Sequence, residues 1–253
     1  MVAVSLKKFF FQAEDGIRDV DLGLGIPAEP LFRSIPKGYA YGTKRQPLDT
    51  NYFETFNKDN VLLVDAKTDG AIEEITEEGI RAGGKEYEFD IIVFATGFDA
   101  MTGPLKALGI KGRGGRALAE EWEDGPHTYL GVAVAGFPNL FTITGPQSPS
   151  VLTNMPVAIE QHVEWIAGCI EAMRKEGKTV IEATPEAQDA WVAHVNEAIA
   201  GTLFPAANSW YMGANIPGKP RAFLPYLGPE GIGGYRKKCD EVAAKGYEGF
   251  ELA

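Results

Sequence analysis

The order of apolar and polar positions predicts three strands of a buried sheet. Residues 60–65 (Asn-Val-Leu-Leu-Val-Asp) form a short apolar run between polar residues, as in a buried strand. Residues 90–95 (Asp-Ile-Ile-Val-Phe-Ala) form the strongest run, and its continuous apolar character predicts burial on both faces. A similar strand is predicted over 140–144. These last two runs lead into Gly97 and Gly145, where the backbone can approach a ligand, as at the strand ends of doubly wound sheets.

Shorter strand signals lie between the first two runs. Residues 71–76, 79–81 and 86–88 are separated by turn residues and predict a small antiparallel meander. After Thr202 the sequence is rich in turn residues, and no further regular element is predicted.

A long helix is predicted after the strand at 140–144. Asn154 can cap its start, Pro156 is tolerated in the first turn, and Gly177 ends it. Apolar residues spaced by 4, 3, 4 and 3 positions predict its buried face: Ile159, Val163, Ile166, Ile170 and Met173.

A second helix is predicted to open at residues 184–186, which read Thr-Pro-Glu. They supply a capping hydroxyl, a proline at the first position and an acid in the first turn. Trp191, Val195 and Ile199 would form its buried face.

Composition narrows the classes of partner. The 253 residues include 24 basic and 35 acidic side chains, a net charge of −11, which disfavours nucleic acid and anionic membranes as partners. Any dinucleotide site must therefore concentrate positive charge locally. Cys169 and Cys239 fit neither a disulfide framework nor a zinc site, so a reducing cytoplasm is expected. The scattered His127, His162 and His194 are interpreted as surface or helix-face residues and not as ligands.

Residues 1–19 do not read as an evolved segment. The stretch from Phe9 to Asp19 resembles the translated read-through of a sequencing adapter, and its apolar part is too short for a signal peptide. Residues 1–19 are therefore expected to be non-native and to make no specific contacts. An N-terminal strand or short helix stays open as the alternative.

Dinucleotide-binding fingerprints are weak in this sequence. Residues 23–28 and 112–117 both match G-x-G-x-x-A, but neither has the strand–turn–helix setting that gives such a match meaning. Lys44 and Arg45 form a basic pair in an acidic chain. That pair is either a solvated surface feature or a site for phosphate or another anion.

Several motifs together resemble the Baeyer–Villiger branch of the class B flavoprotein monooxygenases. The similarity runs from about residue 35 to the C-terminus. Its motifs, in chain order, are Gly-Thr-Lys-Arg at 42–45 with 47–52, Ala-Thr-Gly-Phe-Asp-Ala at 95–100, Gly-Phe-Pro-Asn-Leu-Phe at 136–141, Gly-Pro-Gln-Ser-Pro at 145–149, Thr-Asn-Met at 153–155, Ser-Trp at 209–210 and Gly-Ala-Asn-Ile-Pro-Gly-Lys at 213–219.

The resemblance implies part of an α/β flavoprotein with two dinucleotide-binding domains. Residues 20–43 would be a remnant of the NADPH-binding domain. Residues 44–253 would be the carboxy-terminal part of the FAD-binding domain and the region beyond it, with the meander and long helices. Family members use FAD, NADPH and O₂ to convert a ketone into an ester or lactone. Both glycine-rich fingerprints and the family's histidine-containing motif are absent here, so the expectation is a carboxy-terminal fragment that is inactive alone and lacks an amino-terminal partner half.

The resemblance also implies roles for individual residues. Arg45 matches the catalytic arginine that stabilises the negatively charged oxygen species attacking the ketone. Lys44 matches the residue that meets the 2′-phosphate of NADPH, and Trp210 a tryptophan that donates to the nicotinamide ribose region. The remaining cofactor contacts implied are Asn154, Met155, Thr96, Gly97 and Gly145.

Three alternatives stay open on the sequence. The first is an N- or S-oxygenating flavin monooxygenase, against which Lys44, Arg45 and Trp210 argue. The second is a non-catalytic acidic α/β module that binds a partner, and the third a truncated product with no native role.

Overall fold

The chain divides into two compact units. The computed structural model describes residues 2–4, 9–12, 40, 42–45, 50–65 and 70–253. One unit comprises residues 1–42 and 46–98, and the other comprises residues 43–45 and 99–253. The residue triplet 43–45 thus belongs with the carboxy-terminal unit, although it lies far from it in sequence.

A four-stranded sheet forms part of the first unit. Its order is β3 (Val61–Val64), β2 (Phe9–Gln12), β1 (Val2–Val4) and β7 (Ile91–Val93). Strand β2 runs parallel to β3, whereas β1 is antiparallel to both β2 and β7. A short helix, α2 (Tyr52–Thr55), precedes β3.

This sheet corrects two expectations. The opening segment does make specific contacts, because β1 and β2 pair with β7 and β3; an aromatic-rich segment has high strand propensity, and strand edges offer unpaired backbone groups. Strand β7 is not buried on both faces, because it lies at the sheet edge and Ile91 and Val93 are exposed. The adapter origin of residues 1–19 stays a prediction.

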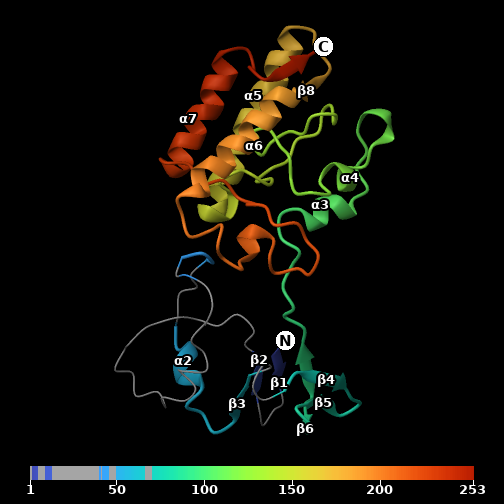
Figure 1. Ribbon diagram of the computed structural model, residues 1–253, viewed down its shortest axis with the longest axis vertical. Helices are drawn as coiled ribbons and strands as arrows, with labels where there is room; N and C mark the ends of the chain where they lie inside the picture. Colours follow the sequence, from blue (N-terminus) through green and yellow to red (C-terminus); the bar gives the residue numbers. More distant parts are fainter. Residues whose placement is uncertain (1, 5–8, 13–39, 41, 46–49, 66–69) are drawn as a thin grey trace. The chain divides into compact units, whose positions relative to one another are not determined.

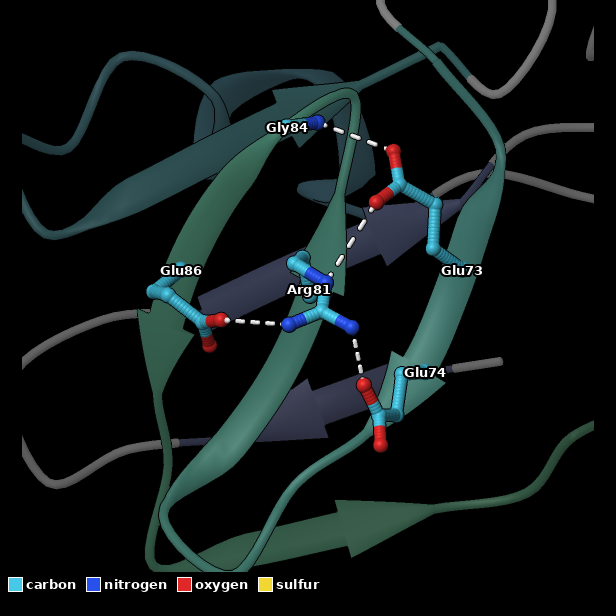
Figure 2. Close-up of polar contacts among 5 residues, drawn as sticks. All are labelled: Glu73, Glu74, Arg81, Gly84 and Glu86. Carbon is cyan, nitrogen blue, oxygen red and sulfur yellow. Dashed lines mark hydrogen bonds and ion pairs between the residues drawn. The ribbon is translucent and has the colours of Figure 1, made fainter.

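The predicted meander is present in the same unit. Strands β4 (Ile72–Ile75), β5 (Gly79–Ala82) and β6 (Lys85–Glu88) form an antiparallel three-stranded sheet. Arg81 on the central strand bridges its neighbours, because its guanidinium pairs with Glu74 on β4 and with Glu86 on β6, the residues directly opposite it (Figure 2).

Glu73 completes this cluster. It lies 3.4 Å from Arg81 Nε and accepts a 2.9 Å hydrogen bond from the Gly84 backbone N–H (Figure 2). These side chains are exposed, so the cluster adds more to strand register than to stability.

Three helices build the core of the second unit. They are α5 (Met155–Lys175), α6 (Pro185–Ala200) and α7 (Gly231–Ala244), which lie alongside one another (Figure 1). Strands β8 (Ile181–Ala183) and β9 (Phe250–Leu252) pair antiparallel at one end of them. The core between the helices is rich in aromatic residues, including Trp165, Trp191 and Tyr235.

Short elements make up the rest of this unit. They are α3 (Gly103–Ala107), η1 (Arg113–Gly115), α4 (Leu118–Glu121), η2 (Ser150–Leu152) and η3 (Trp210–Met212). The glycine-rich match at 112–117 thus forms a 3₁₀ turn ahead of a four-residue helix.

Both predicted helices exist, but the buried face of α5 differs from the prediction. Met173 is buried, whereas Ile159, Val163 and Ile170 are 37–46% exposed and Ile166 is only partly buried. The buried residues lie on an adjacent face of the helix: Ala158, Gln161, His162, Trp165, Cys169 and Met173. Aliphatic spacing alone did not identify this face because polar and aromatic side chains that bond to α7 occupy it.

The ends of α5 and α6 agree better with the sequence. Thr184 caps α6 by accepting a 3.2 Å hydrogen bond from the Ala187 backbone N–H. Trp191, Val195 and Ile199 are buried as predicted. Gly177, with φ of 67°, follows the end of α5.

Two elements differ from the sequence prediction. Residues 140–144 form no strand, because Thr144 has a left-handed φ of 51° and donates its N–H to a histidine side chain. The region after Thr202 was predicted to be irregular, yet it contains α7 and β9. The glycines at the start of α7 have low helix propensity, so a helix was not predicted there. Its buried residues are Tyr235, Cys239 and Val242.

Both cysteines are buried free thiols. Within the described part of the chain, no helix has the length and apolar character needed to cross a membrane.

Candidate functional site

The second unit contains a strained loop just before α5. Thr144, Gln147 and Ser150 are non-glycine residues with φ of 51°, 65° and 33°. Left-handed backbone at such residues costs about 1–3 kcal/mol each and is retained only where the surroundings enforce it. Three such residues within 144–150 therefore mark a loop whose shape is imposed by its contacts.

Gln147 is held from both sides of its backbone. Its N–H donates to Leu224 O at 2.5 Å, and its carbonyl accepts from Trp191 Nε1 at 3.1 Å. Its side-chain oxygen accepts from both the N–H and the hydroxyl of Thr128, at 3.1 and 2.8 Å. The next carbonyl, of Ser148, accepts from Tyr226 N at 2.7 Å. Every one of these partners is buried, so the bonds are shielded from water.

Two glycines allow the loop to pack this closely. A Cβ on Gly131 (φ 69°) would lie 2.6 Å from the backbone N of Ser148. A Cβ on Gly145 would lie 2.4 Å from Thr142 Oγ1 and 2.5 Å from the carbonyl of Gly131. Gly145 was predicted as a cofactor contact, which stays a prediction; the structure shows that its missing side chain serves packing within the loop.

Arg45 is anchored to the end of this loop. Its Nη1 donates a 2.6 Å hydrogen bond to the carbonyl of Val151, in the 3₁₀ turn that leads into α5. The Arg45 side chain itself is exposed. A guanidinium keeps its charge at any working pH, so this contact fixes a permanent cation beside the loop.

The amino-terminal end of α5 lies directly after this loop. Asn154 occupies the N-cap position as predicted, with extended backbone, but no side-chain capping bond forms among the residues described. Asn154 is exposed and Met155 is half-buried. The first N–H groups of a helix have no partner within it and, together with the helix dipole, favour a negative charge nearby.

The basic pair and Trp210 are brought together by Ser209. The buried Ser209 hydroxyl donates a 2.5 Å hydrogen bond to the carbonyl of Thr43 and accepts from Tyr211 N at 3.2 Å. Lys44 and Trp210, each next to one end of this contact, are half-buried. Two residues 166 positions apart are thus joined by a hydrogen bond from a side chain to the backbone.

The charge of Arg45 affects the pKa of Tyr211. Burial raises the pKa of Tyr211 above its ordinary value, and the positive charge of Arg45 opposes that rise. The Tyr211 ring lies 4.3 Å from the ring of Trp210, in an edge arrangement. The basic pair, the tryptophan and the start of α5 therefore belong to one neighbourhood.

Two predicted site residues lie in the other unit. Thr96 and Gly97 follow β7, and Gly97 has φ of 79° with open space where a Cβ would stand. Asp99, the first residue of the second unit after that segment, forms an ion pair with Lys219. Lys219 also donates to the carbonyl of Ala100 at 3.0 Å.

The residues that hold the loop were not identified from the sequence. Thr128 and His162 lie in no motif, and Gln147, although part of the motif at 145–149, was given no role of its own. His162 was interpreted as a surface or helix-face residue. A signal was available, because His162 falls on the same helical stripe as Ala158, Trp165 and Cys169. No group of side chains suited to a metal ion occurs in the described part of the chain.

The comparisons with known proteins agree on one family. A protein described as a Baeyer–Villiger monooxygenase, from Pseudooceanicola batsensis, is 48% identical over 205 residues, which are 81% of this chain and 37% of that protein. Acetone monooxygenase (methyl acetate-forming) from Gordonia sp. is 47% identical over 87% of this chain and 41% of its own length. The chain belongs to the Baeyer–Villiger monooxygenase family. No family model matches it.

Two further comparisons refine this assignment. Phenazine N-monooxygenase from Lysobacter antibioticus is 45% identical over 82% of this chain and 38% of its own length. The solved structure of OTEMO in complex with FAD and NADP is 39% identical, with a TM-score of 0.82, covering 90% of this chain and 41% of that one. The chain thus spans about two fifths of the length of the Baeyer–Villiger relatives that it matches.

Proposed function

We propose that this chain is the carboxy-terminal part of an FAD- and NADPH-dependent monooxygenase that inserts one oxygen atom of O₂ into a ketone. The observation that carries the proposal is the anchoring of Arg45 on Val151, in the 3₁₀ turn that precedes α5. It places a permanent cation and a helix N-terminus in one neighbourhood, an arrangement suited to a negatively charged reactant. Residues 20–43 would belong to the NADPH-binding domain and residues 44–253 to the FAD-binding domain and the region beyond it.

The charges of the residues present suit a bound flavin. Asn154 and Met155 open a 21-residue helix whose first N–H groups favour negative charge, as does Arg45, which is anchored on the turn before that helix. FAD, when bound, supplies the activation of O₂. We expect Arg45 to stabilise negative charge on the reacting oxygen. Thr96 and Gly97 would contact FAD through their backbone, and Gly145 would contribute to the shape of the loop beside it.

NADPH would be held by the part of the site that contains Lys44 and Trp210. Lys44 is a point charge suited to the 2′-phosphate, and Trp210 offers an indole N–H to the nicotinamide ribose region. The Ser209–Thr43 hydrogen bond supports this assignment, because it fixes the backbone next to both residues.

A chimera tests the proposal. The amino-terminal part of the Gordonia acetone monooxygenase would be joined ahead of the matched region of this chain. We expect the chimera to purify yellow with FAD and to convert a simple ketone to an ester with NADPH and O₂. The chain alone should bind neither cofactor tightly, since it lacks glycine-rich turns for their pyrophosphates. A chimera that folds yet holds no FAD would favour the non-catalytic module.

N-oxygenation is the second candidate function. The identity of 45% with a phenazine N-monooxygenase favours it, because the similarity alone does not separate ketone from nitrogen substrates. Both candidates use the same cofactors and O₂. Product analysis of the chimera with a ketone and with an aromatic nitrogen heterocycle decides between them.

Cellular context follows from composition and thiol chemistry. Burial raises the pKa of Cys169 to about 11 and that of Cys239 to about 12, so both thiols are poorly reactive. Both thiols are also free and not joined in a disulfide, which suits a reducing compartment, so we propose a cytoplasmic location. The net charge of −11 supports small-molecule partners, a ketone and O₂, over nucleic acid or membrane.

A further inference from the structure

A buried histidine connects the strained loop to the helical core. His162 lies on α5 and is 1% exposed. Its Nδ1 accepts a 2.8 Å hydrogen bond from the backbone N–H of Thr144. Its Nε2 lies 2.8 Å from the hydroxyl of Tyr235 on α7, which donates a 2.6 Å bond to the carbonyl of Leu130.

These contacts define the protonation state of the ring. A backbone N–H only donates, so Nδ1 must be the unprotonated nitrogen. A carbonyl only accepts, so the single hydroxyl proton of Tyr235 points to Leu130, and the Tyr235 oxygen accepts from Nε2–H. The neutral imidazole with its proton on Nε2 is the only form that satisfies all three bonds. The effect of burial on the pKa of the ring outweighs a hydrogen bond to the Thr142 backbone, which favours the charged form.

Each end of this hydrogen-bond chain terminates at a left-handed residue. Thr144 has φ of 51° and precedes Gly145, and Leu130 has φ of 57° and precedes Gly131. Gly131 and Gly145 also meet each other, because a Cβ on Gly145 would lie 2.5 Å from the Gly131 carbonyl. His162 and Tyr235 therefore hold together the two backbone segments that set the shape of the loop.

We propose that His162 is a positioning residue of the candidate site. Through its Nδ1 acceptor it fixes the turn at Thr144–Gly145, and through that turn the loop that ends at Val151, where Arg45 is anchored. The inference deepens the proposed function and rests on it for the meaning of the site. The hydrogen bonds themselves are independent of that function.

Two matched variants of the 253-residue chain test the proposal. In His162→Asn, the side-chain oxygen lies near the position of Nδ1 and can still accept from Thr144. In His162→Gln, the longer side chain places its amide near the position of Nε2 and loses that acceptor. We expect the Thr144 amide to exchange with solvent about tenfold faster in His162→Gln, and close to the parental rate in His162→Asn.

Nuclear magnetic resonance of the ring nitrogens gives a second reading. Long-range proton–nitrogen correlations at neutral pH should show the proton on Nε2. A proton on Nδ1 overturns the proposal, as does slow Thr144 exchange in His162→Gln. If His162→Gln does not fold, fast Thr144 exchange in the folded His162→Asn variant also overturns it.

The chimera links this hydrogen bond to the cofactor. We expect the flavin absorption spectrum to shift in His162→Gln and to be restored in His162→Asn, which a general loss of stability would not produce. An unchanged spectrum in a His162→Gln chimera whose Thr144 amide has opened overturns the positioning role. A parental chimera without FAD contradicts the proposed function instead, and the exchange rates of the chain alone still decide the role of His162 in the loop.

Discussion

The guanidinium of Arg45 donates a 2.6 Å hydrogen bond to the carbonyl of Val151, 106 positions later in the chain. That bond connects a basic tripeptide, residues 43–45, to the loop that precedes the 21-residue helix α5. A second bond, from Ser209 to Thr43, connects the same tripeptide to the segment carrying Trp210. Two short contacts thus assemble three sequence motifs that lie far apart along the chain.

Replacing Arg45 should separate oxygenation from cofactor reduction. In the chimera, we expect Arg45→Ala to lower ketone oxidation by about 10²–10³, a typical loss for a fixed group that stabilises developing charge. Reduction of FAD by NADPH should fall by no more than about tenfold, because that step does not depend on the charge of the reacting oxygen. Stopped-flow absorbance and hydrogen peroxide release measure the two steps. A near-parental rate of ester formation in Arg45→Ala would show that Arg45 is not catalytic.

Replacing Lys44 should affect one cofactor more than another. We expect Lys44→Ala to raise the KM for NADPH in the chimera far more than the KM for NADH, because only NADPH carries the 2′-phosphate. Lys44→Arg keeps the charge and serves as the control, with a smaller change. Steady-state rates with both cofactors provide the comparison. Equal increases for NADPH and NADH would contradict the assignment.

Two glycines with nearly equal φ separate backbone strain from crowding. A Cβ on Gly131 (φ 69°) would stand 2.6 Å from Ser148, whereas a Cβ on Gly109 (φ 65°) would meet only open space. Gly109→Ala should cost about 1 kcal/mol of unfolding free energy, from the left-handed backbone alone. Gly131→Ala should cost a further 1–3 kcal/mol, roughly, from overpacking against the loop. Urea denaturation followed by tryptophan fluorescence measures both changes. Equal losses of unfolding free energy in the two variants would mean that the loop shifts to accommodate the added methyl group at little cost.

The sequence predicted elements well where local signals agree with their surroundings. The meander, the ends of α5 and the Thr184 cap of α6 follow from turn residues, glycine and capping chemistry, which act within a few positions. The buried face of α5 did not follow, because tertiary contacts of His162 and Trp165 with α7 decide it. The missing strand at 140–144 has the same origin, since the N–H of Thr144 is used by a side chain.

The candidate site was only partly accessible to sequence reasoning. The motif residues Arg45, Asn154 and Trp210 were found through family resemblance, and the structure brings their segments together. The groups that hold the loop were not found, because Thr128 lies in no motif and the motif at 145–149 does not show that Gln147 bonds to a residue 19 positions earlier. Long-range hydrogen bonds of this kind leave no periodic trace in a sequence.

Removing residues 1–19 should affect the first unit and not the second. Strands β1 and β2 pair with β7 and β3, all of which lie in the first unit, whereas the four tryptophans all lie in the second. We expect the tryptophan fluorescence melt to stay within about 0.5 kcal/mol of the parental chain after the deletion. Hydrogen exchange at β3 and β7 should become faster, because both strands lose a partner. A clear loss in the tryptophan melt would contradict this independence.

The pH dependence of stability should show a contribution from His162. Burial lowers the pKa of His162 from its ordinary value of 6.5 to about 4 in the folded chain. Between these values the unfolded chain binds a proton that the folded chain does not, so stability falls as the pH decreases from about 6.5 toward 4. The shift corresponds to about 3 kcal/mol in total, since one pKa unit is about 1.4 kcal/mol.

The His162→Asn variant isolates this contribution. Asparagine does not titrate, whereas carboxylates such as Glu248, whose pKa is lowered by Lys245, are common to both proteins and cancel in the difference. We therefore expect the stability of the parental chain relative to His162→Asn to be constant above about pH 6.5 and to fall by about 3 kcal/mol by pH 4. Urea denaturation at a series of pH values measures the difference. Parallel curves across that range would mean that the pKa of the imidazole is the same in the folded and unfolded chains, and would contradict the prediction.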